Sequence, residues 1–236
     1  MCNPFLPLQG AIIDFPSLFG RDKEIRRIFE SLNGGSSVAL IGVRGVGKSS
    51  VLQAIRKQAH HELVPPRQPI YLNLESVTNE RDFYQLLCHA LRMETCAGFQ
   101  FQRVLKQNNK RILLILDEVD KMVWQDFSQQ TARQLRSLAE GRHAPLSLVM
   151  ATSTPLGELF PDLQIARATS CFTGIFIEEQ IQEWSQEIAS DFIRNRLANT
   201  EIQFTEGEIY KLVKQSSGNP QKLMCLCHQA YQIYQK

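Results

Sequence analysis

The sequence has no long hydrophobic run and no recognisable N-terminal signal. No apolar run approaches the roughly 20 residues that a membrane-spanning helix needs. The N-terminal stretch MCNPFLPLQGAIIDF has prolines among its apolar residues and no basic segment ahead of them. It is therefore typical of neither a signal peptide nor a membrane anchor. We expect a cytoplasmic protein without a membrane partner.

Paired cysteines and a strong charge bias are also missing. The only closely spaced cysteines among the six are Cys225 and Cys227, separated by one residue. A zinc knuckle needs C-x-x-C pairs, so we expect reduced thiols without a metal ion. The 26 basic and 24 acidic residues give a net charge of +2, which neither requires nor excludes nucleic acid. The absence of internal repeats excludes a solenoid.

The chain does have short apolar runs that alternate with segments of helical length. The apolar runs occupy 37–43, 69–74, 111–117, 146–151 and 171–177, and the helical segments occupy 48–61, 80–91, 99–107 and 124–139. Continuous apolar strands separated by helices predict a parallel sheet with helices on both faces. The predicted fold class of residues 1–177 is therefore α/β.

After residue 177 the pattern predicts helices alone, over 178–197, 205–215 and 219–234. Thr205 and Glu208 have the spacing of a capping box, and Pro220 occupies a first-turn position. We expect a small all-helical subdomain over 178–236. It follows a core of residues 1–177, in which the segment 1–36 precedes the first strand.

The first motif with a chemical role is G-x-x-x-x-G-K-S at 42–49, which lies between a predicted strand and a predicted helix. Glycines in this pattern let backbone N–H groups surround a phosphate, and the N-terminus of the following helix favours the anion. Lys48 is placed to contact the β and γ oxygens, and the Ser49 hydroxyl to bind Mg²⁺. We predict a nucleotide-phosphate site formed by Gly42, Arg44, Gly45, Val46, Gly47, Lys48, Ser49 and Ser50.

Two further predicted strands end in polar residues that could bind the metal ion or take part in hydrolysis at this phosphate. RILLILDEVD contains Asp117, placed to hold Mg²⁺, and Glu118, placed to activate water for attack on the γ-phosphate. The strand in LSLVMATSTP ends in Thr152, Ser153 and Thr154, whose hydroxyls lie near the γ-phosphate if this strand lies between the other two. We therefore assign catalysis to Lys48, Glu118, Thr152 and Ser153.

With these motifs the chain resembles the AAA+ and STAND branches of P-loop ATPases, in particular prokaryotic, archaeal-type ATPases. N-P-F at 3–5, F-G-R-D-x-E at 19–24 and G-N-P at 218–220 carry the resemblance. It implies an ASCE-type P-loop NTPase core with a helical lid, ATP or ADP with Mg²⁺ as ligands, and ATP hydrolysis. It also implies that segment 1–36 lies on the adenine side, and that the nucleotide is contacted by Phe19, Gly20, Arg21 and Pro220.

Some features of related proteins are missing. The lid segment reads Asn219, Pro220, Gln221 and Lys222, where many relatives carry a sensor 2 arginine. The N-K-x-D pattern that reads guanine is absent, which disfavours GTP. An arginine finger would have to come from Arg133, Arg136, Arg142 or Arg167. Of these, Arg142 lies just before the predicted strand 146–151, which leads to Thr152 and Ser153, the residues that match sensor 1 in the family.

The resemblance implies a nucleotide-driven conformational switch in signal transduction or defence. The switch would pass its signal to a protein partner or to a C-terminal effector region beyond this sequence. The chain could also form homo-oligomers that depend on the bound nucleotide. The alternative is a DNA-associated AAA+ ATPase, a loader or transposition adaptor, although no basic, aromatic-rich stretch supports DNA binding. A nucleotide-binding scaffold without turnover is the third hypothesis.

Overall fold

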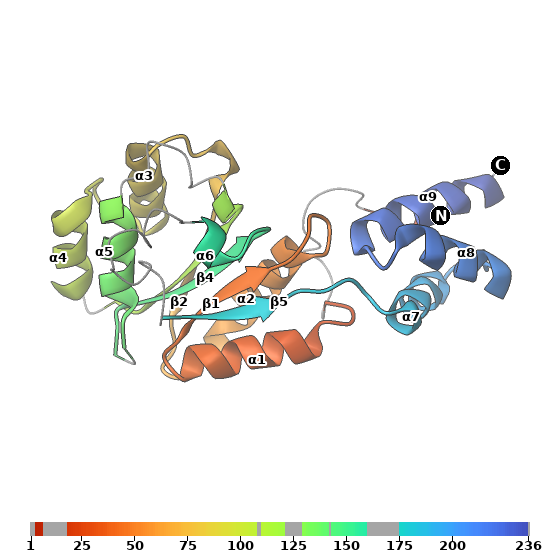
Figure 1. Ribbon diagram of the computed structural model, residues 1–236, viewed down its shortest axis with the longest axis horizontal. Helices are drawn as coiled ribbons and strands as arrows, with labels where there is room; N and C mark the ends of the chain where they lie inside the picture. The colour runs from red at the N-terminus through yellow and green to blue at the C-terminus, as the bar shows by residue number, and fades with distance from the viewer. Residues whose placement is uncertain are drawn as a thin grey trace.

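The computed structural model describes residues 3–6, 18–107, 110–120, 129–141, 143–159 and 175–235, which form a sheet-containing core and a helical subdomain at its end (Figure 1). The core contains, in chain order, α1 (Asp22–Asn33), β1 (Ser37–Ile41), α2 (Lys48–Glu62), β2 (Gln68–Asn73), a 3₁₀ turn (Leu74–Ser76), α3 (Glu80–Ala90), α4 (Gly98–Gln107), β3 (Ile112–Asp117), α5 (Gln129–Ala139), β4 (Leu146–Thr152), α6 (Leu156–Leu159) and β5 (Phe176–Gln180). The helical subdomain contains α7 (Gln186–Leu197), α8 (Glu206–Ser216) and α9 (Pro220–Tyr234).

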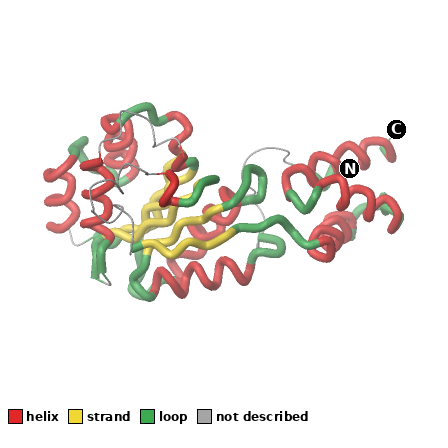
Figure 2. The backbone as a smooth tube through the Cα atoms, in the orientation of Figure 1, coloured by secondary structure: helices red, strands yellow, loops and turns green. Residues whose placement is uncertain are grey.

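The strands form one parallel sheet, which is yellow in Figure 2. The strand order is β2-β3-β4-β1-β5. The β4 strand lies between β1 and β3, the position in which Thr152 and Ser153 were predicted to lie near the γ-phosphate. Ile41 pairs with Thr152, and Asn73 pairs with Asp117. The carboxyl ends of β1, β3 and β4, each followed by predicted site residues, therefore meet at one edge of the sheet.

Side-chain alternation along the buried strands divides the core into two apolar layers. In β3, Ile112, Leu114 and Leu116 pack with α3, α4 and α5, whereas Leu113 and Ile115 pack with α1 and α2. All six residues of β3 are buried, as expected for a strand covered on both faces. The predicted α/β class with a parallel sheet between helices is confirmed.

The boundary between sheet and lid differs from the prediction. Residues 178–180 were expected to begin a helix, but they complete β5, and the helix begins only at Gln186. The charged residues suggested a helix because β5 is an edge strand with largely exposed side chains. Its backbone instead pairs with β1, and Glu179 forms an ion pair with Arg27 of α1. Residues 171–174 and 124–128 of the predicted elements lie outside the described residues.

The N-P-F box packs with the helical subdomain, although the expected division grouped it with the core. Phe5 is fully buried there, with its ring stacked on Phe204 at 6.0 Å between centroids. The Asn3 side chain donates to the carbonyl of His228, and Arg196 donates to the carbonyl of Pro4. Figure 1 accordingly shows the N-terminus beside α9.

Sequence signals for the ends of the lid helices are confirmed. Thr205 and Glu208 form the capping box at the start of α8, and the Asn219 side chain caps α9 with Pro220 in its first turn. None of the helices in the described parts of the chain is long and apolar enough to cross a bilayer.

Candidate functional site

The glycine-rich loop 42–47 connects β1 to α2 at the carboxyl edge of the sheet. Gly45 has φ +81°, a backbone conformation that other residues rarely adopt, so the sequence needs glycine here to make the turn. The α2 helix begins at Lys48, directly after the loop. Its first N–H groups have no partners within the helix, and its dipole favours negative charge at this point.

Lys48, the first residue of α2, is partly buried and lies near the acidic side chains at this edge of the sheet. Its Nζ donates to the carbonyl oxygens of Gly42 at 2.6 Å and Val43 at 3.3 Å. Burial lowers the pKa of Lys48. The negative charges of the Asp120, Glu118 and Asp117 carboxylates oppose this shift. The sheet edge therefore brings the predicted lysine and both predicted acidic residues into one electrostatic environment.

Asp117 is held at the end of β3 by two hydrogen bonds. The Tyr71 hydroxyl donates to Asp117 Oδ2 at 2.8 Å, and the Glu118 amide donates to Asp117 Oδ1 at 3.0 Å. Burial, reinforced by the charge of Asp117, raises the pKa of Tyr71, so the hydroxyl stays protonated as a donor. Asp117 is only 3% exposed, and these two hydrogen bonds fix the orientation of its carboxylate.

Glu118 turns the chain sharply away from the strand. Its φ of +58° is left-handed, a conformation that costs a non-glycine residue about 1–2 kcal/mol. The residue is exposed, whereas the preceding Asp117 is buried. The two neighbouring carboxylates are therefore placed differently, which suits the separate roles predicted for them.

The end of β4 is tied to the loop after β3 through Asp120. The buried Thr152 hydroxyl lies 2.9 Å from Asp120 Oδ1, and the Ser153 amide donates to Asp120 Oδ2 at 2.9 Å. Thr152 is thus engaged within the protein, while Ser153 is exposed. This contact orients the two strand ends relative to each other, and the Ser153 side chain faces solvent at the same edge.

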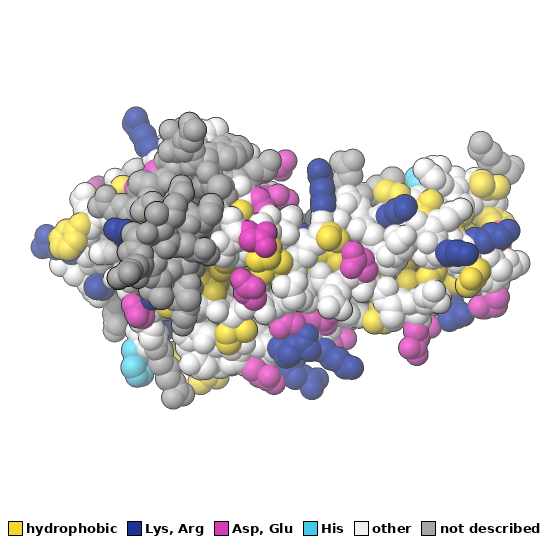
Figure 3. All heavy atoms as spheres, in the orientation of Figure 1, with side chains coloured by type: hydrophobic (Ala, Val, Ile, Leu, Met, Phe, Trp, Pro, Cys, Tyr) yellow, Lys and Arg dark blue, Asp and Glu magenta, His cyan; other side chains and the backbone are white. Residues whose placement is uncertain are grey.

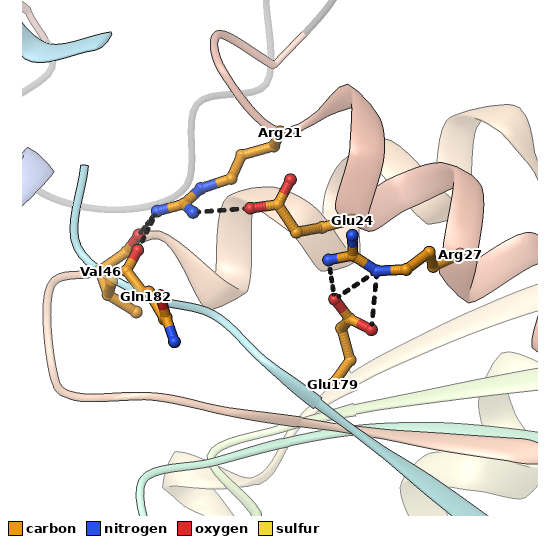
Figure 4. A network of polar contacts seen from close by, with 6 residues as sticks. All are labelled: Arg21, Glu24, Arg27, Val46, Glu179 and Gln182. Atoms are coloured by element: carbon orange, nitrogen blue, oxygen red, sulfur yellow. Dashed lines mark hydrogen bonds and ion pairs between the residues drawn. The ribbon is translucent and has the colours of Figure 1, made fainter. Parts of the chain in front are cut away.

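Arg21 makes buried contacts behind the glycine-rich loop 42–47, called the phosphate loop from here on. It is 4% exposed, and its Nη2 donates to the carbonyls of Val46 at 3.1 Å and Gln182 at 2.7 Å (Figure 4). Its Nη1 pairs with Glu24 Oε1 at 3.0 Å. The side chain therefore joins α1, the phosphate loop and the connection that leads from β5 to the helical subdomain.

Phe19 and Gly20 face the helical subdomain. The Phe19 ring packs edge-on against Trp184 at 6.1 Å and Phe192 at 5.5 Å between centroids. A Cβ on Gly20 would lie 2.8 Å from Ile188 Cγ2, so another side chain would force a shift. Trp184 Nε1 is buried and lacks a hydrogen-bond partner in the described part of the chain. The F-G-R box lies between core and lid, and its adenine contacts stay a prediction.

The G-N-P segment of the lid touches the phosphate loop directly. Asn219 Nδ2 donates to the carbonyl of Arg44 at 3.0 Å, and the Gln221 amide donates to the carbonyl of Gly45 at 3.2 Å. A Cβ on Gly45 would lie 2.7 Å from Gln221 Oε1, which is a second reason for glycine at this position. Pro220, at the first turn of α9, is therefore brought next to the loop that was predicted to bind phosphate.

The arrangement suits a nucleotide with a divalent ion. A Cβ on Gly47 would meet no atom within 4 Å, so there is open space beside the loop at the start of α2. The oxygen donors of Ser49 and Asp117 are the hard ligands that Mg²⁺ prefers. Ser49 is partly exposed and Ser50 is buried, so Ser49 is the hydroxyl accessible to a bound ion. The residues present fit ATP or ADP with Mg²⁺.

Three residues that matter to this geometry were not identified from the sequence. Asp120 had a signal, because it is the third carboxylate in LDEVD. Tyr71 and Gln182 had none, since their contacts depend on a neighbouring strand and on a backbone carbonyl. Of the candidate arginine fingers, Arg142 and Arg167 lie outside the described residues, and Arg133 and Arg136 lie on α5.

Comparisons with known proteins identify a family and a fold for this chain. A family model described as an AAA domain matches residues 32–160. The Walker-type ATPase PABY2304 of Pyrococcus abyssi is similar in structure, with a TM-score of 0.71 at 16% identity over 94% of this chain and 69% of that one. The ORC2 protein of Aeropyrum pernix, in its ADPNP–ADP complexes, has a TM-score of 0.66 at 14% identity over 93% of this chain.

The chain spans 63% of the length of that Aeropyrum pernix protein in those complexes and 64% in its ADP form. None of the curated proteins matches the sequence. At these levels of identity the similarity to solved structures shows the fold, a P-loop NTPase with a parallel five-stranded sheet.

Proposed function

The chain belongs to the AAA domain family of ATPases, and on that premise we propose that it is a Mg²⁺-dependent ATPase whose helical lid moves when nucleotide exchanges. One observation carries the proposal. The loop 42–47 follows the strand end beside the carboxylates, and its carbonyls accept hydrogen bonds from the lid at Asn219 and Gln221. A change in the loop on phosphate binding therefore acts directly on the lid.

Most of the residues predicted near the phosphates have a role in this proposal. Backbone N–H groups of the loop and the first turn of α2 bind the β-phosphate, with Lys48 exchanging its contacts to Gly42 and Val43 for phosphate oxygens. Ser49 and Asp117 would hold Mg²⁺, which when bound would neutralise charge on the phosphates. Glu118 orients and deprotonates the attacking water, and Ser153 contacts the γ-phosphate.

Phe19, Gly20 and Pro220 form the base side in this proposal, because all three lie where the core meets the lid. Phosphate contacts that form and break with hydrolysis are a common way to bias a two-state element. The lid would then pass the nucleotide state to a protein partner or to an effector region in signal transduction or defence.

The first experiment measures nucleotide binding and turnover together. Fluorescent ADP and ATP are titrated with Mg²⁺ into the wild type, Lys48→Ala, Glu118→Gln and Lys57→Ala. Lys48→Ala is expected to lose binding, and Glu118→Gln to keep binding but lose hydrolysis. Lys57 is exposed on the same helix, so Lys57→Ala is the matched control and should behave as the wild type. Unchanged affinity in Lys48→Ala would remove the phosphate-site assignment.

Size-exclusion light scattering with ADP, an ATP analogue and duplex DNA distinguishes a nucleotide-driven switch from a DNA-associated ATPase. Assembly on ATP analogue alone supports the switch and directs the search for an arginine finger to the subunit interface. Assembly only with DNA would favour a loader or transposition adaptor instead. On the face drawn in Figure 3, the basic and acidic side chains of the described residues are interspersed, so these residues form no single-sign surface there that favours DNA.

A further inference from the structure

The connection 181–185, which leads from β5 to α7, packs against the start of the phosphate loop. The Ile181 amide donates to the carbonyl of Ile41 at 2.7 Å. A Cβ on Gly42 would lie 2.4 Å from the Ile181 carbonyl oxygen, so glycine is required for this approach. The first residue of the loop and the first residue of the connection are therefore in direct backbone contact.

Arg21 joins the same two segments further along. A single atom, Nη2, donates both to the Val46 carbonyl in the loop and to the Gln182 carbonyl in the connection (Figure 4). Nη1 is held by Glu24 on α1, which fixes the plane of the guanidinium group. Because Arg21 is buried, a shift of Val46 that breaks or moves this contact is not compensated by water.

The connection is in turn attached to the lid. The Trp184 amide donates to the carbonyl of Gly218 at 2.8 Å, and a Cβ on Gly218 would lie 2.4 Å from the Trp184 carbonyl oxygen. Gly218 directly precedes Asn219, the cap of α9. The Trp184 ring also contacts Phe192 of α7, with 4.9 Å between centroids. Movement of residues 181–184 therefore reaches two lid helices.

We propose that Arg21 is a positioning residue that couples the phosphate loop to the lid by holding the Val46 and Gln182 carbonyls on one nitrogen. This inference rests on the proposed nucleotide binding and names the contact by which that binding controls the lid. Arg21 acts through the loop backbone, not through the base. Its loss should therefore weaken binding of the phosphates alone as much as binding of the whole nucleotide.

The neighbouring Arg27 provides a matched control. It lies on α1, the helix whose N-cap residue is Arg21, and it pairs with β5 through Glu179 (Figure 4). Its side chain is 53% exposed, so this is a surface ion pair, which contributes little on average. It contacts neither the loop nor the connection in the described hydrogen bonds. Arg27→Gln thus removes an α1 arginine without touching the proposed coupling.

The test uses Trp184 as a reporter in a Trp124→Phe background, since the chain has two tryptophans. ADP and inorganic tripolyphosphate are titrated with Mg²⁺, following affinity and Trp184 emission. In Arg21→Gln both affinities should fall on the order of tenfold, and the emission change at saturation should be mostly lost. Arg21→Lys should lie in between, because lysine keeps the charge but not the planar fork. Arg27→Gln should stay within about twofold of the wild type.

Circular dichroism melting checks that each variant is folded. If Arg21→Gln does not fold, Glu24→Gln tests the same contact. Glu24→Gln releases Nη1 and should reduce both affinities in the same direction by a smaller factor. Wild-type affinity with a full emission change in the Arg21 variants would overturn the proposal. So would a loss of ADP affinity without loss of tripolyphosphate affinity, which would indicate a base contact. A wild type that binds neither ligand would refute the nucleotide function itself.

Discussion

Replacing Phe5 by alanine tests whether the N-P-F box is part of the lid. The Phe5 ring is fully buried, stacked on Phe204 and edge-on to Tyr231 at 6.2 Å between centroids. Removing a buried phenylalanine ring costs about 3–5 kcal/mol, from lost burial and from the cavity that remains. The lid has a small apolar cluster of its own, so the cost should fall on α7, α8 and α9.

Hydrogen exchange measured by mass spectrometry assigns the loss to a region, which a single melting curve cannot do. A cost of 3–5 kcal/mol corresponds to amide exchange that is roughly a hundredfold to several thousandfold faster in the lid helices. Amides of β1, β3 and β4 should keep their protection, because Phe5 does not belong to either apolar layer of the core.

Leu6→Ala is the matched control for this prediction. Leu6 is the next residue along the chain, and it is 41% exposed. Its truncation should change stability by no more than about 0.5 kcal/mol. Lid exchange in Phe5→Ala that matched the rates of Leu6→Ala would refute the assignment of residues 3–6 to the lid. Faster exchange throughout the core would show instead that the two parts unfold as one unit.

Three further predictions concern single contacts. Gly45→Ala adds a Cβ 2.7 Å from Gln221 Oε1 at φ +81°, so ADP affinity should fall by tenfold or more by calorimetry, and unchanged affinity would contradict the loop geometry. Tyr71→Phe removes the donor to Asp117, so thermal unfolding should show a loss of about 1–2 kcal/mol, whereas no loss would contradict that contact. The Tyr234 hydroxyl and the Thr205 capping box lower the pKa of Glu208, so its stabilising contribution is present above the ordinary value of 4.5 and is lost as pH falls below it. The stability difference between wild type and Glu208→Gln should therefore shrink on acidification through that range, and a pH-independent difference would argue against this linkage.

The interior strands and the phosphate loop could be predicted from local sequence alone. The β3 strand is apolar throughout because it is covered on both faces, and that composition is visible without a structure. Edge strand β5 was predicted only in part, because backbone pairing with β1, and not side-chain composition, places residues 178–180 in the sheet. Local patterns describe buried strands better than exposed ones.

The candidate site divides in the same way. Lys48, Ser49, Asp117 and Glu118 were predicted because phosphate and metal chemistry demand those residue types at fixed spacing from strand ends. The family resemblance marked Arg21 without showing what its side chain contacts. Both of its carbonyl partners belong to the backbone, which accepts hydrogen bonds whatever the side chain is, so the sequence carries no signal for them.

By itself, the sequence determined a P-loop followed by strands ending in carboxylates and hydroxyls, and a helical lid with its caps. Only the tertiary structure decided that Phe5 belongs to the lid, that Asp120 joins the ends of β3 and β4, and that Arg21 bridges loop and connection. The physical reason is the separation along the chain of the residues that interact. Caps, turns and strand composition act over a few residues, whereas these contacts join segments far apart in the chain that meet only when sheet and lid are assembled.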